Sequence, residues 1–236
     1  LNSVRPCIYL DIINPIVCKE VINLIKPDVI LNFAALTSVD YCERNPALAN
    51  EVNVVGLENL LTNFKKTIIH ISSDYVFDGN NGPYSENDST NPINIYGMSK
   101  LKSEQLLSSN SENSLIIRAN VIYDYLNNSS ASFLNWVVYS LKNKKEINVV
   151  NDQINNPTWT SSITVVIDRA IELELAGLLH WGDRELLDRY EFAKKIADSF
   201  KLDKSLIKPI STIDLKQDAL RPLKCGLKTD YAQKIL

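Results

Sequence analysis

Thr67-Ile-Ile-His-Ile-Ser-Ser-Asp74 is predicted to form a buried strand, because a nearly continuous apolar run of this length is typical of such strands. A similar run, Val29 to Phe33, comes before it, and Leu115-Ile-Ile-Arg118 comes after it. Helical patterns separate these runs, as in residues 46–61. Strands that are joined through helices need crossover connections, so the sequence predicts an α/β fold in which a doubly wound parallel sheet carries helices on both faces.

The alternation extends toward the N-terminus. Cys7–Leu10 is a short apolar run closed by Asp11, and Asn14-Pro15 then opens a helix whose apolar residues are near helical spacing. Pro27-Asp28 ends that helix. The first 120 residues therefore alternate two kinds of segment throughout.

The regular alternation of strands and helices ends after Asn120. The sequence then predicts helices at 133–141, 161–175 and 189–200, and strands at 147–150 and 177–181. The second of these strands is expected to rejoin the main sheet. We predict a larger domain of residues 1–126 that is rejoined by about 158–181, and a smaller C-terminal domain of 127–157 and 182–236. The Asn-rich stretch 127–130 is expected to form a loop.

The composition and net charge limit the kinds of partner that the protein is expected to bind. The 236 residues are 45% hydrophobic and carry a net charge of −3, which argues for a globular protein and against nucleic acid or an anionic membrane surface. No apolar run approaches the roughly 20 residues that span a membrane. Four cysteines lie far apart and only two histidines accompany them, which argues against a zinc site and for reduced thiols in a cytoplasmic protein.

The sequence Tyr96-Gly-Met-Ser-Lys100 has the composition of a proton-transfer site. It follows Asn91-Pro92, where we expect a helix to start, so the phenol and the ammonium should share one helical face. A lysine beside a tyrosine favours the phenolate and lowers the phenol pKa from about 10, which suits proton exchange with a substrate oxygen. The spacing alone is a weak signal, because Tyr190-Glu-Phe-Ala-Lys194 repeats it.

The surrounding sequence separates the two pairs. Tyr190 continues the apolar stripe of its own helix, and no strand that ends in a hydroxyl precedes it, so we assign it to packing. Tyr96 follows the strand that ends in Ser73, and ligands bind at the carboxyl ends of parallel strands. Ser73 can hydrogen-bond the carbonyl oxygen that Tyr96 protonates, so Ser73, Tyr96 and Lys100 are the predicted catalytic set.

A serine followed by Tyr-x-x-x-Lys resembles the active site of the extended short-chain dehydrogenases/reductases. Within them the chain resembles the dTDP-4-dehydrorhamnose reductase family over nearly its whole length, in Leu10–Pro15, Pro27–Ala35, Val39-Asp40, Val52-Asn53, Ser72–Gly79, Tyr96–Lys100 and Arg221-Pro222. The resemblance implies a Rossmann-like, NAD(P)-dependent oxidoreductase. Its substrate would be a 4-keto sugar nucleotide, reduced from dTDP-4-dehydro-L-rhamnose to dTDP-L-rhamnose in dTDP-rhamnose biosynthesis.

Carried over residue by residue, the resemblance also implies ligand contacts. Lys100 would hold the nicotinamide-ribose hydroxyls in addition to its catalytic role. The implied cofactor residues are Asp11, Ile12, Ala34, Ala35, Leu36, Asn53, Tyr96 and Lys100, and the implied substrate residues are Asp74, Tyr75, Asn120 and Val121. Val121 stands where an aromatic residue is common in the family, which leaves the exact sugar open. No residue is implied as a metal ligand.

The family begins with a strand, a glycine-rich turn and a helix that hold the pyrophosphate of the dinucleotide. None of the seven glycines of this chain lies in such a turn, and Leu1 stands just before the position of the family's third strand. We expect a further N-terminal segment to precede it. The choice between NADPH and NADH is left open, because the deciding residues follow the family's second strand.

Two other functions remain open at this stage. The segments Leu179–Gly182, Arg189–Glu191 and Ile196–Asp198 also resemble the regulatory β subunit of methionine adenosyltransferase, a non-catalytic protein with the reductase fold. An epimerase or dehydratase is a weaker reading, because Tyr75 rather than a glutamate follows Asp74. The expected partner is a sugar nucleotide, and a homodimer is left open.

Overall fold

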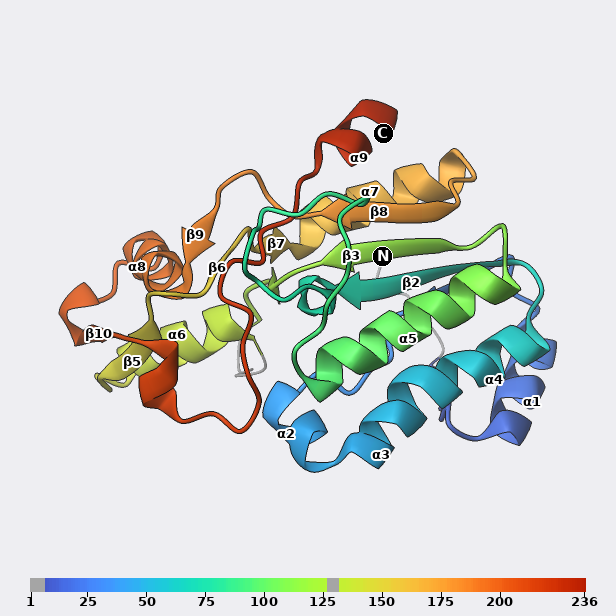
Figure 1. The fold of residues 1–236 in the computed structure, drawn as a ribbon, viewed down its shortest axis with the longest axis horizontal. Coiled ribbons are helices and arrows are strands. Elements are labelled where there is room, and N and C mark those ends of the chain that lie inside the picture. The colour runs from blue at the N-terminus through green and yellow to red at the C-terminus, as the bar shows by residue number, and fades with distance from the viewer. Residues whose placement is uncertain (1–6, 127–131) are drawn as a thin grey trace.

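Four parallel strands form the main sheet of the computed structural model, which describes residues 7–126 and 132–236 (Figure 1). They are β1 (Val29–Asn32), β2 (Thr67–Ser73), β3 (Leu115–Ala119) and β8 (Gly177–Trp181), and they lie in the order β1-β2-β3-β8. All three neighbouring pairs are parallel. The predicted parallel sheet is confirmed, and β8 rejoins it as expected.

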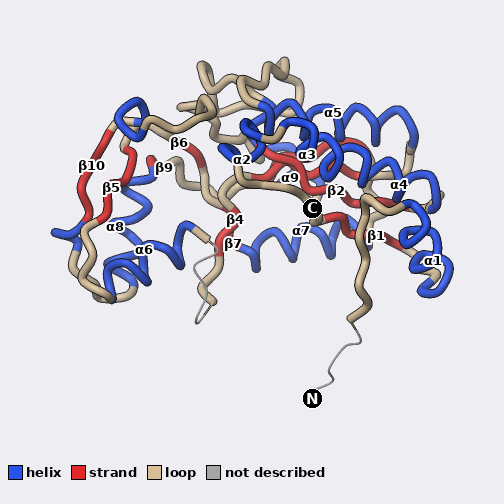
Figure 2. The backbone as a smooth tube through the Cα atoms, turned by 90° about the horizontal axis from the view of Figure 1, so that it is seen from below, coloured by secondary structure: helices blue, strands red, loops and turns tan. Residues whose placement is uncertain are grey.

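Helices cover both faces of this sheet, because the side chains of each strand alternate between the faces. Ile68 of β2 and Ile116 of β3 pack against α1 (Pro15–Ile25), α4 (Gly56–Asn63) and α5 (Ile95–Asn110). Ile69 and Ile117 pack on the opposite face against α7 (Thr160–Glu172) and α9 (Asp230–Ile235). The two apolar layers make the doubly wound arrangement (Figures 1 and 2).

The connection from β1 to β2 is more divided than the single helical pattern predicted for residues 46–61. It runs through α2 (Val39–Arg44), α3 (Pro46–Asn50), a π-helical turn (Glu51–Val55) and α4. The buried Asn53 lies in this turn, and its side chain accepts a hydrogen bond from the Leu36 N–H. Gly56 follows the turn, and a Cβ there would lie 2.5 Å from the Ile12 side chain, so a larger residue would require Ile12 to move.

A second lobe lies beside the main sheet (Figure 2). Its apolar core joins α6 (Phe133–Lys142), β5 (Ile147–Val150), α8 (Arg189–Ser199) and β10 (Ile207–Ile210), and β5 pairs with β10 in parallel. Short two-residue strands link the lobe to the sheet: β4 (Ile122–Tyr123) with β7 (Thr158–Trp159), and β6 (Ile154–Asn155) with β9 (Leu187–Asp188). The division of the chain into the two sequence domains stays a prediction.

Two local predictions differ from the structure, and a third is untested. Residues 7–10 pair with no strand in the described part of the chain, and their side chains are exposed. The helix that carries Tyr96 begins after Asn94 rather than Asn91, because the Asn94 side chain accepts a hydrogen bond from the Gly97 N–H at 2.8 Å. The Asn-rich stretch 127–130 lies outside the described residues. In the ranges that are described, no helix has the length and apolar character to cross a membrane.

Candidate active site

The predicted catalytic residues line one cleft of about 380 Å³ at the carboxyl ends of β1, β2 and β3. Parallel strands place their carboxyl ends on the same edge of the sheet, and this edge faces α8 of the second lobe. The cleft is lined by Phe33, Ala35, Thr37, Val39, Ile71, Ser72, Ser73, Asp74, Tyr75, Tyr96, Lys100, Ala119, Val121, Ile122 and Arg189. The structure therefore brings together Ser73, Tyr96 and Lys100.

Ser73 is the last residue of β2 and is held in a fixed orientation. Its hydroxyl donates to Asp74 Oδ1 at 3.0 Å and accepts a hydrogen bond from the Tyr75 N–H at 3.2 Å. The second bond caps a short 3-10 turn over Asp74–Val76. Because its proton is directed to Asp74, the oxygen of Ser73 keeps a lone pair for a donor in the cleft.

Tyr96 lies in the first turn of α5, buried against neighbouring aromatic residues. Its ring meets that of Tyr75 edge to face at a centroid distance of 5.6 Å. Burial raises the pKa of the Tyr96 phenol above its ordinary value, and the nearby Ser73 hydroxyl acts in the opposite direction. The phenol is therefore protonated at neutral pH, and it can act as a proton donor without further activation.

Lys100 shares the helical face of Tyr96, but its amine is bound elsewhere. Its Nζ lies 2.8 Å from the Ile71 carbonyl oxygen and 3.0 Å from His70 Nε2. Burial lowers the pKa of Lys100 to about 8, and the charge of Glu104 opposes the shift. The prediction that Lys100 lowers the phenol pKa of Tyr96 is wrong in this structure, because burial dominates the tyrosine and the lysine side chain ends at β2.

Behind the cleft, a buried ion pair ties α5 to the sheet. Arg118 of β3 donates to Glu104 through Nε at 2.9 Å and through Nη2 at 2.7 Å, a bidentate arrangement. Glu104 Oε1 also accepts the hydroxyl proton of Ser72 at 2.5 Å. The network joins the carboxyl ends of β2 and β3 to the middle of α5, which fixes the relative positions of Ser73 and Tyr96.

The predicted cofactor residues divide into two groups. Ala35 lines the cleft, with Ala34 and Leu36 beside it in the loop after β1. Asn53 holds that loop, since its Oδ1 accepts the Leu36 N–H at 2.7 Å and its Nδ2 donates to the Leu36 carbonyl at 3.1 Å.

The other two predicted cofactor residues, Asp11 and Ile12, do not line the cleft. Ile12 is buried against α4, and Asp11 Oδ1 accepts a hydrogen bond from the Ile13 N–H. The structure therefore places these two residues at the start of α1, apart from the catalytic set.

The predicted substrate residues carry unmatched polar atoms and backbone strain. Asp74 Oδ2 and Asn120 Oδ1 are buried and have no hydrogen-bond partner within the described residues. Burial raises the pKa of Asp74 to about 7 and that of Tyr75 to about 12. Val121 has a φ of 43°, which is costly for a β-branched residue and marks functional sites in many proteins.

Sequence reasoning missed Arg189, the first residue of α8, which lines the cleft from the second lobe. It also lines an adjoining pocket of about 340 Å³, together with Tyr75 and Arg221. Burial lowers the pKa of the Arg189 guanidinium from its ordinary value, and Tyr75 and Asp74 oppose the shift. In the sequence, Arg189–Glu191 stands out only as part of the resemblance to the regulatory β subunit, and the neighbouring Tyr190 is assigned to packing.

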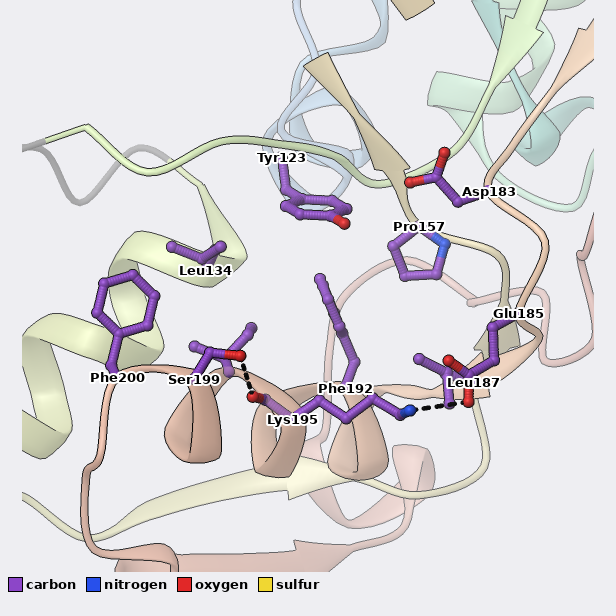
Figure 3. A pocket seen from close by; sticks show the side chains of 11 residues that line it. Tyr123, Leu134, Pro157, Asp183, Glu185, Leu187, Phe192, Lys195, Ser199 and Phe200 are labelled. Carbon is purple, nitrogen blue, oxygen red and sulfur yellow. Dashed lines mark hydrogen bonds and ion pairs between the residues drawn. The ribbon is translucent and has the colours of Figure 1, made fainter. Parts of the chain in front are cut away.

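A separate hollow of about 240 Å³ lies along α8 (Figure 3). Phe192 and Leu187 form its apolar floor, and Lys195 and Glu185 form an ion pair at its rim. None of the predicted site residues lines it. Within the described ranges, no cluster of three or more potential metal ligands occurs at either place.

Known proteins are similar to this chain over most of its length. The family model described as RmlD substrate binding domain matches residues 4–236. The dTDP-4-dehydrorhamnose reductase of Aggregatibacter actinomycetemcomitans is 34% identical over 95% of this chain and 81% of its own length. Methionine adenosyltransferase 2 subunit beta of Xenopus tropicalis is 32% identical over 86% of this chain, and the chain spans only 64% of that relative.

The comparison with solved structures agrees with the comparison of sequences. The dTDP-4-dehydrorhamnose reductase of Bacillus anthracis, in complex with NADP, superposes with a TM-score of 0.89 at 31% identity, over 95% of this chain and 80% of that chain. The dTDP-glucose 4,6-dehydratase of Streptomyces venezuelae, at 19% identity over 95% of this chain and 71% of that chain, has a TM-score of 0.81 and shares the fold. The resemblance seen in the sequence is confirmed, and the chain belongs to the RmlD substrate binding domain family.

Proposed function

We propose that the protein is a reductase that uses NADPH to convert the keto group of a dTDP-4-dehydro sugar, dTDP-4-dehydro-L-rhamnose, to the alcohol of dTDP-L-rhamnose. The observation that carries the proposal is the meeting of Ser73, Tyr96 and Lys100 in one cleft. Relatives that are named dTDP-4-dehydrorhamnose reductases support it, at 34% and 31% identity over 95% of the chain.

The cleft has groups that suit the nicotinamide-ribose end of NADPH. Ala35 leaves room for a close approach to the loop after β1, and the Lys100 amine offers a donor for ribose hydroxyls. The unmatched Asp74 Oδ2 and Asn120 Oδ1 can accept hydrogen bonds from a polar ligand. We choose NADPH over NADH because the Bacillus anthracis structure is a complex with NADP.

The chain's own residues supply the proton side of the reaction. NADPH, when bound, supplies the hydride that reduces the carbonyl carbon. The Tyr96 phenol, which burial keeps protonated, gives its proton to the carbonyl oxygen, so ketone and hydride become an alcohol. To orient that oxygen, the Ser73 hydroxyl turns its proton from Asp74 Oδ1 to the carbonyl. Solvent restores the phenol proton afterwards. A neutral phenol is the form required for reduction, and burial keeps the phenol in that form.

The sugar nucleotide would lie between the two lobes. Arg189 and Arg221 line the adjoining pocket together with Phe133 and Trp136. Guanidinium groups bind phosphate oxygens with paired donors, and aromatic rings stack on a base. Arg221 is held by Asp40 at 2.8 Å, whereas no carboxylate in the described ranges forms an ion pair with Arg189. Arg189 is thus our first candidate for the diphosphate, and the lobe that carries it is the proposed substrate domain.

The test is turnover with purified protein and both dinucleotides. NADPH oxidation in the presence of dTDP-4-dehydro-L-rhamnose, with dTDP-L-rhamnose as product, is the expected result. Absence of oxidation with either NADPH or NADH, in protein that binds the sugar nucleotide, would refute the reductase proposal.

The similarity to methionine adenosyltransferase 2 subunit beta supports a second candidate, a regulatory subunit. This candidate predicts a stable complex with a methionine adenosyltransferase and a change in the activity of that enzyme. Mixing the two purified proteins and measuring complex mass separates the candidates. A cytoplasmic location, in keeping with four free cysteines, is part of either proposal, and the homodimer stays a prediction.

A further inference from the structure

The Lys100 amine ends a buried chain of hydrogen bonds that begins at β1 and crosses β2. Asn32 Nδ2 lies 3.0 Å from His70 Nδ1, and His70 Nε2 lies 3.0 Å from Lys100 Nζ. The three residues are 4%, 1% and 2% exposed, so their polar atoms face one another and not bulk solvent. Each proton in the chain must therefore be accounted for by these groups themselves.

The Ala34 N–H determines which atoms donate. It donates to Asn32 Oδ1 at 3.2 Å, which leaves the donor atom Nδ2 of Asn32 facing His70. His70 Nδ1 must then be the acceptor, and a neutral imidazole with one acceptor nitrogen carries its proton on the other. Burial lowers the pKa of His70 well below its ordinary value, so the ring is neutral and Nε2–H points at Lys100.

Lys100 can accept a hydrogen bond from the Nε2–H of His70 only as an uncharged amine. An ammonium has three donors and no lone pair, whereas an uncharged amine has a lone pair. One Nζ hydrogen is directed to the Ile71 carbonyl oxygen at 2.8 Å. The contact with His70 is therefore a hydrogen bond when the amine is neutral and a contact between two donors when it is charged.

We propose that Asn32 and His70 are positioning residues that favour the neutral form of the Lys100 amine. Charging Lys100 requires the Nε2 proton of His70 to pass to Nζ while a solvent proton binds Nδ1. The Asn32 amide then turns over to accept from Nδ1–H, and the hydrogen bond from Ala34 is lost. The charge of Lys100 is thereby coupled to the loop after β1, which lines the cleft. The use of this coupling in catalysis rests on the proposed reductase function.

The charged groups around Lys100 leave His70 as its direct partner. Glu104, on the same helix, favours the charged amine, but its carboxylate is bound by Arg118 of β3 and Ser72 of β2. Asp74, Tyr96 and Arg189 line the same cleft, and Asp74 Oδ1 is bound by Ser73. Among the described residues, Nζ forms hydrogen bonds only with His70 and Ile71.

The second histidine provides an internal reference. His180 Nδ1 lies 3.1 Å from the Tyr84 carbonyl oxygen, and its Nε2 lies 3.2 Å from Arg118 Nη1. A carbonyl only accepts and a guanidinium only donates, so His180 carries its proton on Nδ1. The chain has two histidines, and the proposal assigns them opposite tautomers.

Nitrogen NMR of protein labelled with ¹⁵N-histidine tests this directly. At pH values above the pKa of Lys100, we expect His70 to carry its proton on Nε2 and His180 to carry its proton on Nδ1. As the pH falls below about 8, His70 should change to Nδ1–H and the Ala34 amide signal should move. Lys100→Met should keep His70 as Nε2–H at every pH. An Nδ1–H tautomer of His70 in the wild type at pH 9.5 would overturn the proposal.

Asn32→Asp replaces the amide with a carboxylate of nearly the same shape, and it should reverse the tautomer of His70. A carboxylate accepts from both the Ala34 N–H and His70 Nδ1–H, so His70 should be Nδ1–H throughout, and the titration of Lys100 should rise by about one pH unit. In turnover, the alkaline limb of the pH profile should move by the same amount. Asn23→Asp, an exposed change on α1, is the control. An unmoved Lys100 titration in Asn32→Asp also overturns the proposal. The NMR readouts need no turnover, so they are separate from failure of the reductase function.

Discussion

At the scale of single residues, Asp74 is held where its charge is disfavoured. Its side chain is 2% exposed, and Oδ2 has no partner within the described residues. Burial raises its pKa to about 7, with Ser73 and Arg189 opposing the shift. Between about pH 4 and pH 7 the folded protein binds a proton that the unfolded chain has released, so this group lowers the free energy of unfolding as the pH rises.

We therefore predict that Asp74→Asn stabilises the protein at pH 8 but not at pH 4. Three pKa units at about 1.4 kcal/mol each set an upper limit of roughly 4 kcal/mol. Urea unfolding at several pH values measures the effect. Asp78→Asn is a control of opposite sign, because hydrogen bonds from Asn80 and Tyr84 lower the pKa of Asp78. A loss of stability at pH 8 in Asp74→Asn would contradict the account.

At this scale the sequence predicted which residues meet but not their protonation. The spacing of Tyr96 and Lys100 correctly put both on one helical face, and the strand end correctly supplied Ser73. It could not show that the long Lys100 side chain ends at His70, which lies 30 residues away in the chain. Burial and contacts of this kind decide a pKa, and neither is encoded in spacing.

At the scale of elements, β2, β3 and α5 are joined by one buried ion pair. The side chains of Arg118 and Glu104 are 5% and 6% exposed, and Arg118 also lies over the Phe77 ring at 5.1 Å. A buried charge without its partner is far more costly than an apolar residue at the same place. The pair therefore makes the position of α5, and with it Tyr96, depend on β3.

Arg118→Leu should lower the free energy of unfolding by about 3–5 kcal/mol, because it leaves Glu104 buried without its partner. The double variant Arg118→Leu/Glu104→Leu should regain much of that loss. Chemical denaturation of the four proteins of this double-mutant cycle gives the coupling energy. Additive losses in the double variant would show that the pair does not act as a unit.

The strands of the main sheet were predicted closely, because runs such as Ile68–Ile71 are buried on both faces and show an unbroken apolar pattern. Helix α2 and the π-helical turn at 51–55 were missed because five or six residues are too short for a helical period to be recognised. Strands of two residues, such as β4, depend on their partner β7 rather than on their own sequence.

At the scale of the whole molecule, the cleft lies between two lobes with separate cores. Arg189 begins α8 in the second lobe, yet it lines both the cleft and the adjoining pocket. We predict that Arg189→Gln raises the KM for the sugar nucleotide by about 10–100-fold, the value of a hydrogen bond to a charged group. The Kd for NADPH should stay unchanged.

Arg184→Gln, at an exposed position before α8, is the matched control for this variant. Steady-state kinetics for the sugar nucleotide and fluorescence titration of NADPH separate the two effects. Equal weakening of both ligands would place Arg189 in the support of the fold rather than in substrate binding.

The central claim is that Tyr96 is the proton donor of a reductase, and the most direct measurement is turnover of Tyr96→Phe beside Tyr190→Phe. Tyr190 has the same four-residue spacing to a lysine but packs against the core of the second lobe. The account predicts that Tyr96→Phe lowers kcat by about 10²–10⁴-fold with an unchanged melting temperature, while Tyr190→Phe keeps wild-type turnover. Wild-type turnover in Tyr96→Phe would contradict it.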